Sequence, residues 1–172
     1  MPEFHTPLPR DNANTPHKAI LKIRNDSVEN FYVFRKNKQI QRYRGTKNSV
    51  NPDPTYFITN PHDTWVHNHP GGSSFSIDDI QMAVFHNVKI FILSTPNYIY
   101  FLERIGDIWP FNPEEPSVND YLLTCQERTK EFLDKLIQKN EIKFFEKDEV
   151  FFHYIWQSFF QKYEANYIQK EF

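Results

Sequence analysis

Residues 67–80, HNHPGGSSFSIDDI, require the chain to leave one kind of secondary structure and begin another within a few positions. The preceding residues, 64–67, have the apolar character of a short buried strand. Pro70-Gly71-Gly72 breaks this strand and begins a turn. Ser76 then precedes the amphipathic stretch 77–85, for which it is a suitable N-cap residue. The sequence therefore predicts a strand, a short loop and a helix in direct succession.

This succession brings metal-binding side chains together. Residues two apart on a strand point to the same face, so His67 and His69 can bind one ion. Asp79 falls in the first turn of the predicted helix, where its carboxylate can bend back toward the strand end. Two histidines and one carboxylate leave a zinc ion one open position for water, which distinguishes a catalytic zinc site from a structural one. We therefore expect a zinc ion held by His67, His69 and Asp79.

The same residues also have an interpretation that needs no metal. Ser76-x-x-Asp79 resembles a capping box, with Asp in place of the usual Glu or Gln. A lone His-x-His pair is common on strands without any metal. The combination of both patterns favours the metal site, and the two interpretations are compatible because Ser76 can cap the helix while Asp79 binds the ion.

The apolar side of the predicted helix includes Ile77, Ile80 and Val84, and Met82 and Phe85 are further candidates to face the core. Packing also explains nearby Trp65, Phe75 and His86. Neither His62 nor His153 has a spacing that would make it a metal ligand.

Composition limits the function classes. The chain has 172 residues, enough for one domain with its own core. Its 20 basic and 22 acidic side chains give no overall electrostatic case for nucleic-acid binding. The single cysteine, Cys125, excludes an internal disulfide and suits a reducing compartment; we interpret it as a buried helix residue. We expect a cytoplasmic protein, because the sequence shows neither a membrane-spanning run nor a signal-peptide pattern.

The chain divides into three stretches. Residues 1–17 contain four prolines and predict a flexible arm whose His5 and His17 face solvent. Residues 18–110 predict the metal-binding core, an α/β fold with a mixed central β-sheet flanked by helices. Its strands are expected at 19–23, 30–35, 39–43, 64–67, 88–93 and 98–103.

Residues 117–172 predict a C-terminal helical extension packed on the core. Apolar residues recur at helical spacing over 117–139 and again over 148–170. The second helix carries an aromatic stripe: Phe152, Ile155, Trp156, Phe159, Tyr163 and Tyr167. We favour packing of this stripe on the core, although part of it could bind a partner or a second copy of the chain.

The motif His67-Asn68-His69-Pro70, followed by Ser76-x-x-Asp79, resembles the JAB/MPN metalloprotein superfamily, whose JAMM signature is Glu, then His-x-His, then Ser-x-x-Asp. It is most similar to the RadC-like and phage-associated bacterial branches. Residues 27–33 resemble the strand entry that carries the family's acidic residue, here Glu29, and 45–50 resemble the segment after the hairpin. The resemblance covers about residues 18–105 and implies a JAB/MPN fold with cytidine-deaminase-like layering.

The chain departs from the family pattern in two places. Six residues, Pro70 to Phe75, separate the second His from Ser76, where the family usually has seven. This difference bears on the choice between Asp78 and Asp79; the Ser-x-x-Asp spacing favours Asp79. In addition, residues 51–54, NPDP, stand where the family has a helix, and the context of Glu29 is weak.

The resemblance implies a zinc metallopeptidase or isopeptidase that acts on a ubiquitin-like or other protein substrate. Glu29 would take a proton from the zinc-bound water, and Ser76 would donate to the oxyanion. Alternatively, Glu29 is an exposed loop charge. The alternative function is a non-peptidase RadC-like module in protein-interaction or nucleic-acid-associated complexes, for example phage-related or defence complexes.

Overall fold

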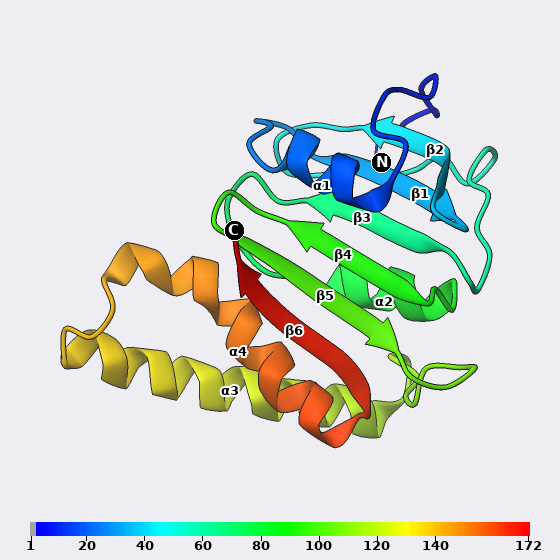
Figure 1. Cartoon of the computed structure of the whole chain (residues 1–172). Helices are drawn as coiled ribbons and strands as arrows, with labels where there is room; N and C mark the ends of the chain where they lie inside the picture. Colours follow the sequence, from blue (N-terminus) through cyan, green and yellow to red (C-terminus); the bar gives the residue numbers. More distant parts are fainter. Residues whose placement is uncertain (1–2) are drawn as a thin grey trace.

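The computed structural model describes residues 3–172 and contains a six-stranded sheet between layers of helices (Figure 1). Across the sheet the strands are β2 (Lys38–Arg44), β1 (Asn30–Arg35), β3 (Thr64–Asn68), β4 (Ile90–Ser94), β5 (Tyr98–Arg104) and β6 (Ala165–Glu171). β3 and β4 are parallel, and the other neighbouring pairs are antiparallel. The predicted α/β class with a mixed central sheet is confirmed.

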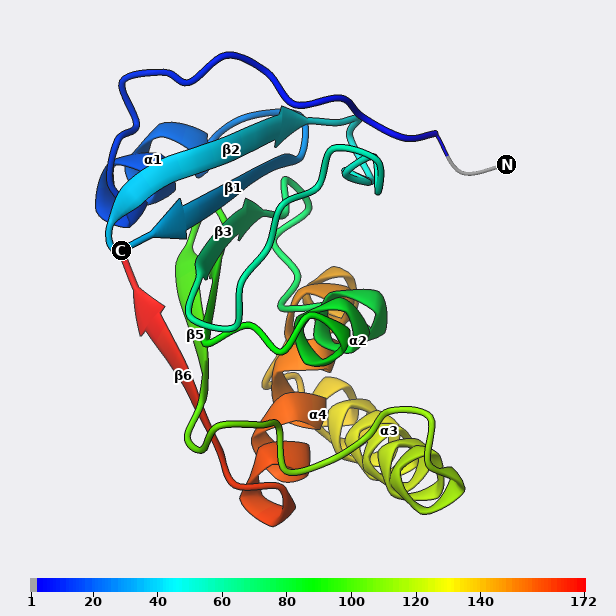
Figure 2. The ribbon, with the colours of Figure 1, turned by 90° about the vertical axis from the view of Figure 1, so that its right-hand side faces the viewer.

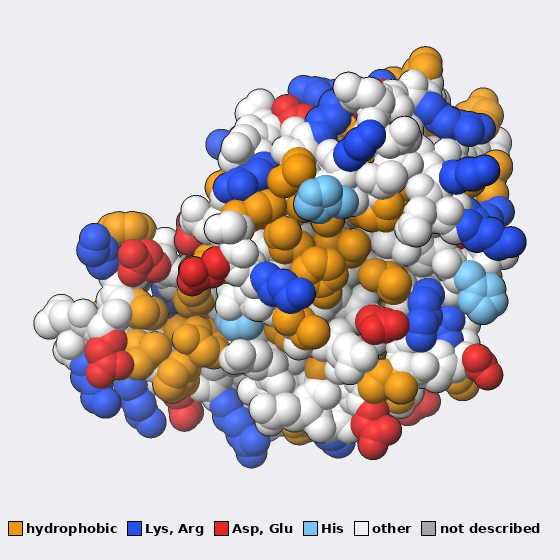
Figure 3. Space-filling model, in the orientation of Figure 1, with side chains coloured by type: hydrophobic (Ala, Val, Ile, Leu, Met, Phe, Trp, Pro, Cys, Tyr) orange, Lys and Arg blue, Asp and Glu red, His pale blue; other side chains and the backbone are white. Residues whose placement is uncertain are grey.

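The helices cover the two faces of the sheet unequally. α1 (Pro16–Ile23) lies on one face, whereas α2 (Ile77–Phe85), α3 (Pro116–Gln138) and α4 (Lys147–Lys162) lie on the other (Figure 2). A short 3₁₀ helix, η1 (Phe144–Glu146), precedes α4. Beside α1, hydrophobic side chains gather over the middle of the sheet (Figure 3), where Ile90, Ile99 and Phe101 are only partly buried.

The burial of β1 follows from its position between two strands and two helical layers. Phe31 and Val33 point into the core beneath α2 and α4, and Tyr32 and Phe34 point toward α1. Successive strand residues face opposite sides, so a strand covered on both faces is apolar throughout. The edge strand β2 instead alternates buried and accessible positions.

The strand expected at residues 19–23 is wrong, because these residues form the C-terminal part of α1. Thr15 caps this helix by accepting a hydrogen bond from the Lys18 amide at 3.3 Å, and Pro16 occupies the first turn. Ala19, Ile20 and Ile23 form its buried face. A short apolar run has no decisive period, and the Thr-Pro start signal preceding it decides the conformation.

The helix expected over 148–170 is wrong in its last part. α4 ends at Lys162, and Ala165–Glu171 forms β6, which pairs antiparallel with β5. The helix expected at 117–139 is confirmed as α3, where Cys125 is buried. The C-terminal extension therefore adds both a helical layer and an edge strand.

The N-terminal arm lies along the sheet edge. The Leu8 amide donates to the Arg42 carbonyl at 2.9 Å, and the His5 amide donates to the Asn51 carbonyl at 2.7 Å. His5 is partly buried, contrary to the solvent-facing expectation, and its Nδ1 accepts from the Asn51 amide at 3.2 Å. Over residues 3–172, no helix is both long and apolar enough to cross a membrane.

Candidate metal centre

The sheet register brings Glu29 to the histidines. β1 and β3 are antiparallel and pair Phe31 with His67. The residue before β1, Glu29, and the residue after β3, His69, therefore lie at the same end of the two strands. Asn68 strengthens this junction because its Oδ1 accepts from the Asn30 amide at 2.6 Å. The antiparallel pairing explains how residues far apart in the sequence meet.

Four ionisable side chains converge at this strand end. His67 Nε2 lies 3.4 Å from Glu29 Oε2 and 3.9 Å from Asp79 Oδ1. His69 Nε2 lies 3.3 Å from Asp79 Oδ2. Glu29, His67 and His69 each offer a ligand atom, and these three atoms lie within 4.8 Å of one another. Glu29 is only 8% exposed, so its interpretation as an exposed loop charge is wrong.

Ser76 and Asp79 form the capping box at the start of α2. Asp79 Oδ2 accepts from both the amide and the hydroxyl of Ser76, each at 2.7 Å. The Asp79 amide in turn donates to Ser76 Oγ at 3.1 Å. These bonds fix the Asp79 carboxylate where it also faces the histidines, while the three ligand atoms that lie within 4.8 Å of one another belong to Glu29, His67 and His69. Asp79, rather than Asp78, occupies the position facing both imidazoles.

The second nitrogen of each histidine contacts the backbone. His67 Nδ1 lies 2.8 Å from the Asn30 carbonyl oxygen, and His69 Nδ1 lies 3.2 Å from the carbonyl oxygens of Ser73 and Ser74. A carbonyl oxygen only accepts, so each Nδ1 carries a proton. In a neutral imidazole, Nε2 then presents its lone pair to the nearby carboxylates. Such lone pairs and anionic oxygens repel one another unless Nε2 is protonated or a metal cation lies between them.

The pKa values indicate the same preference for positive charge. Burial by itself lowers the pKa of His69, but the adjacent Asp79 carboxylate outweighs burial and raises this pKa to about 9. Burial by itself raises the pKa of Asp79, and the two histidines reverse that effect and hold it well below its usual range. Nitrogen and oxygen donors in this arrangement suit a divalent metal ion. The buried Glu29, His67 and His69 group can hold a metal ion.

The centre opens into a cavity of about 370 Å³, which Glu29, both histidines, Ser76 and Asp79 line. The segment 47–51 forms much of the opposite wall. A substrate group can therefore reach the converging side chains from solvent.

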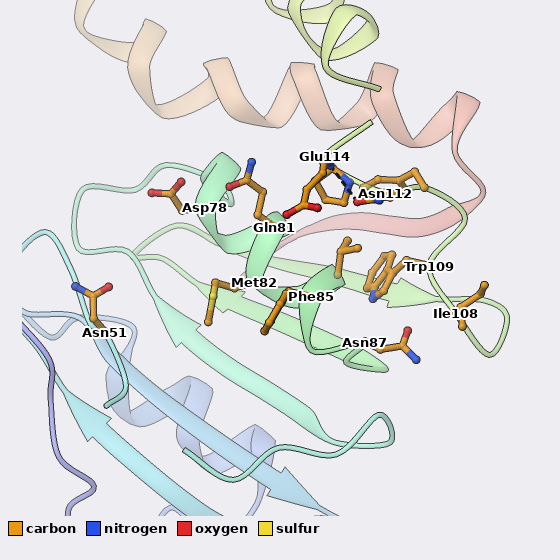
Figure 4. A pocket seen from close by; sticks show the side chains of 13 residues that line it. Asn51, Asp78, Gln81, Met82, Phe85, Asn87, Ile108, Trp109, Asn112 and Glu114 are labelled. Carbon is orange, nitrogen blue, oxygen red and sulfur yellow. Dashed lines mark hydrogen bonds between the residues drawn. The ribbon is translucent and has the colours of Figure 1, made fainter. Parts of the chain in front are cut away.

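A second cavity, of about 870 Å³, adjoins the first along α2 and shares Asn51 and Asp78 with it. Figure 4 shows Met82 and Phe85 along one wall, with Ile108 and Trp109 on the loop after β5. Met82 and Phe85 are 41% and 80% exposed, so the expectation that they face the core is wrong. Only part of the apolar side of α2 packs against the core. The rest of that side, with Met82 and Phe85, lines this cavity.

Several contributors to the site were not predicted from the sequence. Asn68 is fully buried between the two histidines and holds the β1–β3 junction. An amide residue between two histidines at the end of a buried strand was the available signal. The Ser73 and Ser74 carbonyls gave no signal, because any residue offers a backbone carbonyl. His86 packs against Phe57 and Trp65, as expected.

The structure thus places Glu29, His67, His69, Ser76 and Asp79 around one cavity. His67 and His69 come from the end of β3, Ser76 and Asp79 from the start of α2, and Glu29 from the residue before β1. Comparison with family models, with curated proteins and with solved structures finds no match for this chain.

Proposed function

We propose that this protein is a zinc-dependent hydrolase of amide or isopeptide bonds. The observation that supports the proposal best is the convergence of two histidine Nε2 atoms with the buried Glu29 carboxylate and the partly buried Asp79 carboxylate beside an open cavity. His67, His69 and Asp79 would hold the zinc ion. Zinc, when bound, supplies a Lewis acid that lowers the pKa of a water ligand toward neutrality.

Asp79 is the preferred third ligand, although Glu29 could also reach the ion. Two hydrogen bonds from Ser76 hold the Asp79 carboxylate in place. The residue lies near both histidines, whereas Glu29 approaches only His67 among the ion-pair contacts of residues 3–172. Glu29 therefore remains available to handle a proton.

Glu29 would act as the general base and then as the general acid. Its carboxylate lines the cavity and is largely shielded from solvent. There it would accept a proton from the attacking water and pass it to the leaving amine. Proton transfer of this kind contributes about 10²–10⁴-fold to a rate.

Ser76 would stabilise the oxyanion. Its hydroxyl donates to Asp79 Oδ2, and its backbone amide donates to the same oxygen. The hydroxyl can turn toward the cavity while the amide continues to hold Asp79. Ser76 would then donate a hydrogen bond to the negative oxygen that develops during amide hydrolysis.

We infer that the chain is a divergent member of the JAB/MPN superfamily. The order Glu29, His67-x-His69 and Ser76-x-x-Asp79 resembles the JAMM signature. These residues follow one another at the start of β1, the end of β3 and the start of α2. This inference favours a polypeptide substrate, and the cavity along α2 offers an apolar surface for one of its side chains.

The direct test is a search for products. Zinc-loaded protein is incubated with a peptide library and with peptides joined through the lysine ε-amino group, and new amino termini and free lysines are detected by mass spectrometry. We expect cleavage by the wild type and none by Glu29→Gln. Identical product profiles for the two proteins would contradict the proposed function.

A further inference from the structure

The C-terminal segment contacts the loop that joins the two parts of the metal centre. This loop, residues 70–76, runs from His69 to the start of α2. Tyr167 on β6 hydrogen-bonds through its hydroxyl to Ser74 Oγ at 2.8 Å. Trp156 on α4 donates its indole N–H to the Phe75 carbonyl at 2.6 Å. The loop is therefore held by elements that lie far away in the sequence.

The same loop orients His69. Its imidazole Nδ1 lies 3.2 Å from each of the Ser73 and Ser74 carbonyl oxygens, and these bonds fix the proton on Nδ1 and leave Nε2 for the metal. A displacement of Ser74 would move one of these carbonyls and tilt the ring. Groups that orient a metal ligand in this way typically change metal affinity about 10–100-fold when removed.

Tyr167 is itself firmly placed. Its hydroxyl lies 2.9 Å from His153 Nδ1 on α4, and its ring stacks on Tyr100 of β5 with centroids 6.3 Å apart. Burial raises the pKa of Tyr167, and burial lowers the pKa of His153. Near neutral pH both side chains are therefore uncharged. Ser74, Tyr167 and His153 form a neutral chain of hydrogen bonds that joins the loop to β6 and α4.

We propose that Tyr167 is a positioning residue of the metal centre, acting through Ser74 on the His69 imidazole. The C-terminal strand is then a structural component of the site rather than an appendage. This role rests on the proposed function because it requires metal binding by His69. It assigns a task to a part of the chain that lies outside the metal-binding motif.

The experiment measures zinc affinity of the full chain by competition with a chromophoric chelator. The variants are Tyr167→Phe, Ser74→Ala and the double variant, each of which removes the hydrogen bond between Tyr167 and Ser74; Tyr167→Phe also removes the contact with His153 Nδ1. Tyr43→Phe is the matched control, because the Tyr43 hydroxyl is buried without a hydrogen-bond partner among residues 3–172. The visible spectrum of the Co²⁺-loaded proteins reports ligand geometry, and thermal unfolding reports stability.

We expect Tyr167→Phe and Ser74→Ala each to weaken zinc binding by about tenfold and to change the Co²⁺ spectrum. The double variant should bind zinc about as weakly as Tyr167→Phe, because the bond to Ser74 is already lost in that variant. Tyr43→Phe should bind zinc like the wild type. If Tyr167→Phe does not fold, Ser74→Ala tests the same bond from the loop side.

Wild-type zinc affinity and an unchanged Co²⁺ spectrum in Ser74→Ala or in a folded Tyr167→Phe would overturn the positioning role. If the losses of zinc affinity in the two single variants add in the double variant, Tyr167 does not act on His69 through Ser74. A wild-type protein that binds no zinc would contradict the proposed function itself, and with it this role for Tyr167.

Discussion

Glu29 Oε2 lies 3.4 Å from His67 Nε2, although Glu29 precedes β1, His67 lies on β3 and no local motif joins them. The antiparallel register of β1 and β3 produces this contact by pairing Phe31 with His67. The residue proposed as the base precedes β1, whereas the proposed metal ligands come from the end of β3 and the start of α2, so the two roles are separable by mutation.

The first prediction concerns metal content. We expect about one zinc ion per purified wild-type chain, as in three-ligand catalytic sites. His67→Ala and His69→Ala should lose the zinc, because each removes a nitrogen donor. His62→Ala is the matched control, since His62 is exposed and lies outside the cluster. Equal zinc in all four proteins, measured by plasma mass spectrometry, would rule out this site.

The two carboxylates should behave differently. Glu29→Gln is expected to keep zinc and to lower hydrolysis by about 10²–10⁴-fold, because it removes the proton acceptor. Asp79→Asn should lose most of the zinc, because it removes a charged ligand and weakens the α2 cap. Zinc analysis beside product assays distinguishes these outcomes. If Glu29→Gln loses zinc and Asp79→Asn keeps it, Glu29 is the metal ligand and Asp79 is not.

The cavity along α2 should bind an apolar substrate group. We compare acetohydroxamate with a hydroxamate that carries a phenylalanine tail, using calorimetry on the zinc-loaded protein. The tail should improve binding by about tenfold in the wild type and much less in Phe85→Ser. Leu123→Ser, which alters another exposed apolar residue, should behave like the wild type. If the phenylalanine tail improves binding to Phe85→Ser as much as to the wild type, the cavity along α2 does not bind the tail.

Removal of residues 141–172 should destabilise the domain. This deletion takes away β6, which leaves the edge of β5 unpaired, and it removes the buried side chains of Trp156 and Phe159. We expect poor solubility or a changed oligomeric state, measured by light scattering after size exclusion. A truncated protein that stays monomeric and equally heat-stable would show that the segment is dispensable.

Stability should depend on pH through His153. Burial lowers its pKa below the ordinary value of 6.5. As the pH falls through about 6.5, the unfolded chain takes up a proton that the folded chain does not. The free energy of unfolding should therefore fall from about pH 7.5 to about pH 5.5, and fall less in His153→Asn, which does not titrate. The free energy of unfolding is measured by urea titration at each pH. An equal fall with pH in the wild type and in His153→Asn would show that His153 does not cause the dependence.

Local patterns in the sequence predicted much of the fold and of the site. Strong periodicity identified α2 and α3, and the spacing of His67, His69 and Asp79 identified the residues that converge at the centre. The helix at 16–23 was missed because a short apolar run fits a strand equally well. β6 was missed because Tyr163 and Tyr167 recur at helical spacing, although the later residues pair with β5.

Contacts that depend on tertiary docking lay beyond the sequence. The bonds from Trp156 to Phe75 and from Tyr167 to Ser74 exist because α4 and β6 pack beside the loop. Residue type and spacing carry no information about such pairs. The sequence could not predict the partial exposure of the apolar side of α2 either, because this exposure depends on which elements cover the helix.

The most direct test of the proposed zinc centre is anomalous diffraction at the zinc absorption edge from crystals soaked in zinc. We expect one strong peak at about 2 Å from the Nε2 atoms of His67 and His69 and from an Asp79 carboxylate oxygen. Glu29 should lie near the ion without replacing Asp79 as a ligand. A peak bound by Glu29 in place of Asp79, or no peak at these histidines, would contradict the proposed centre.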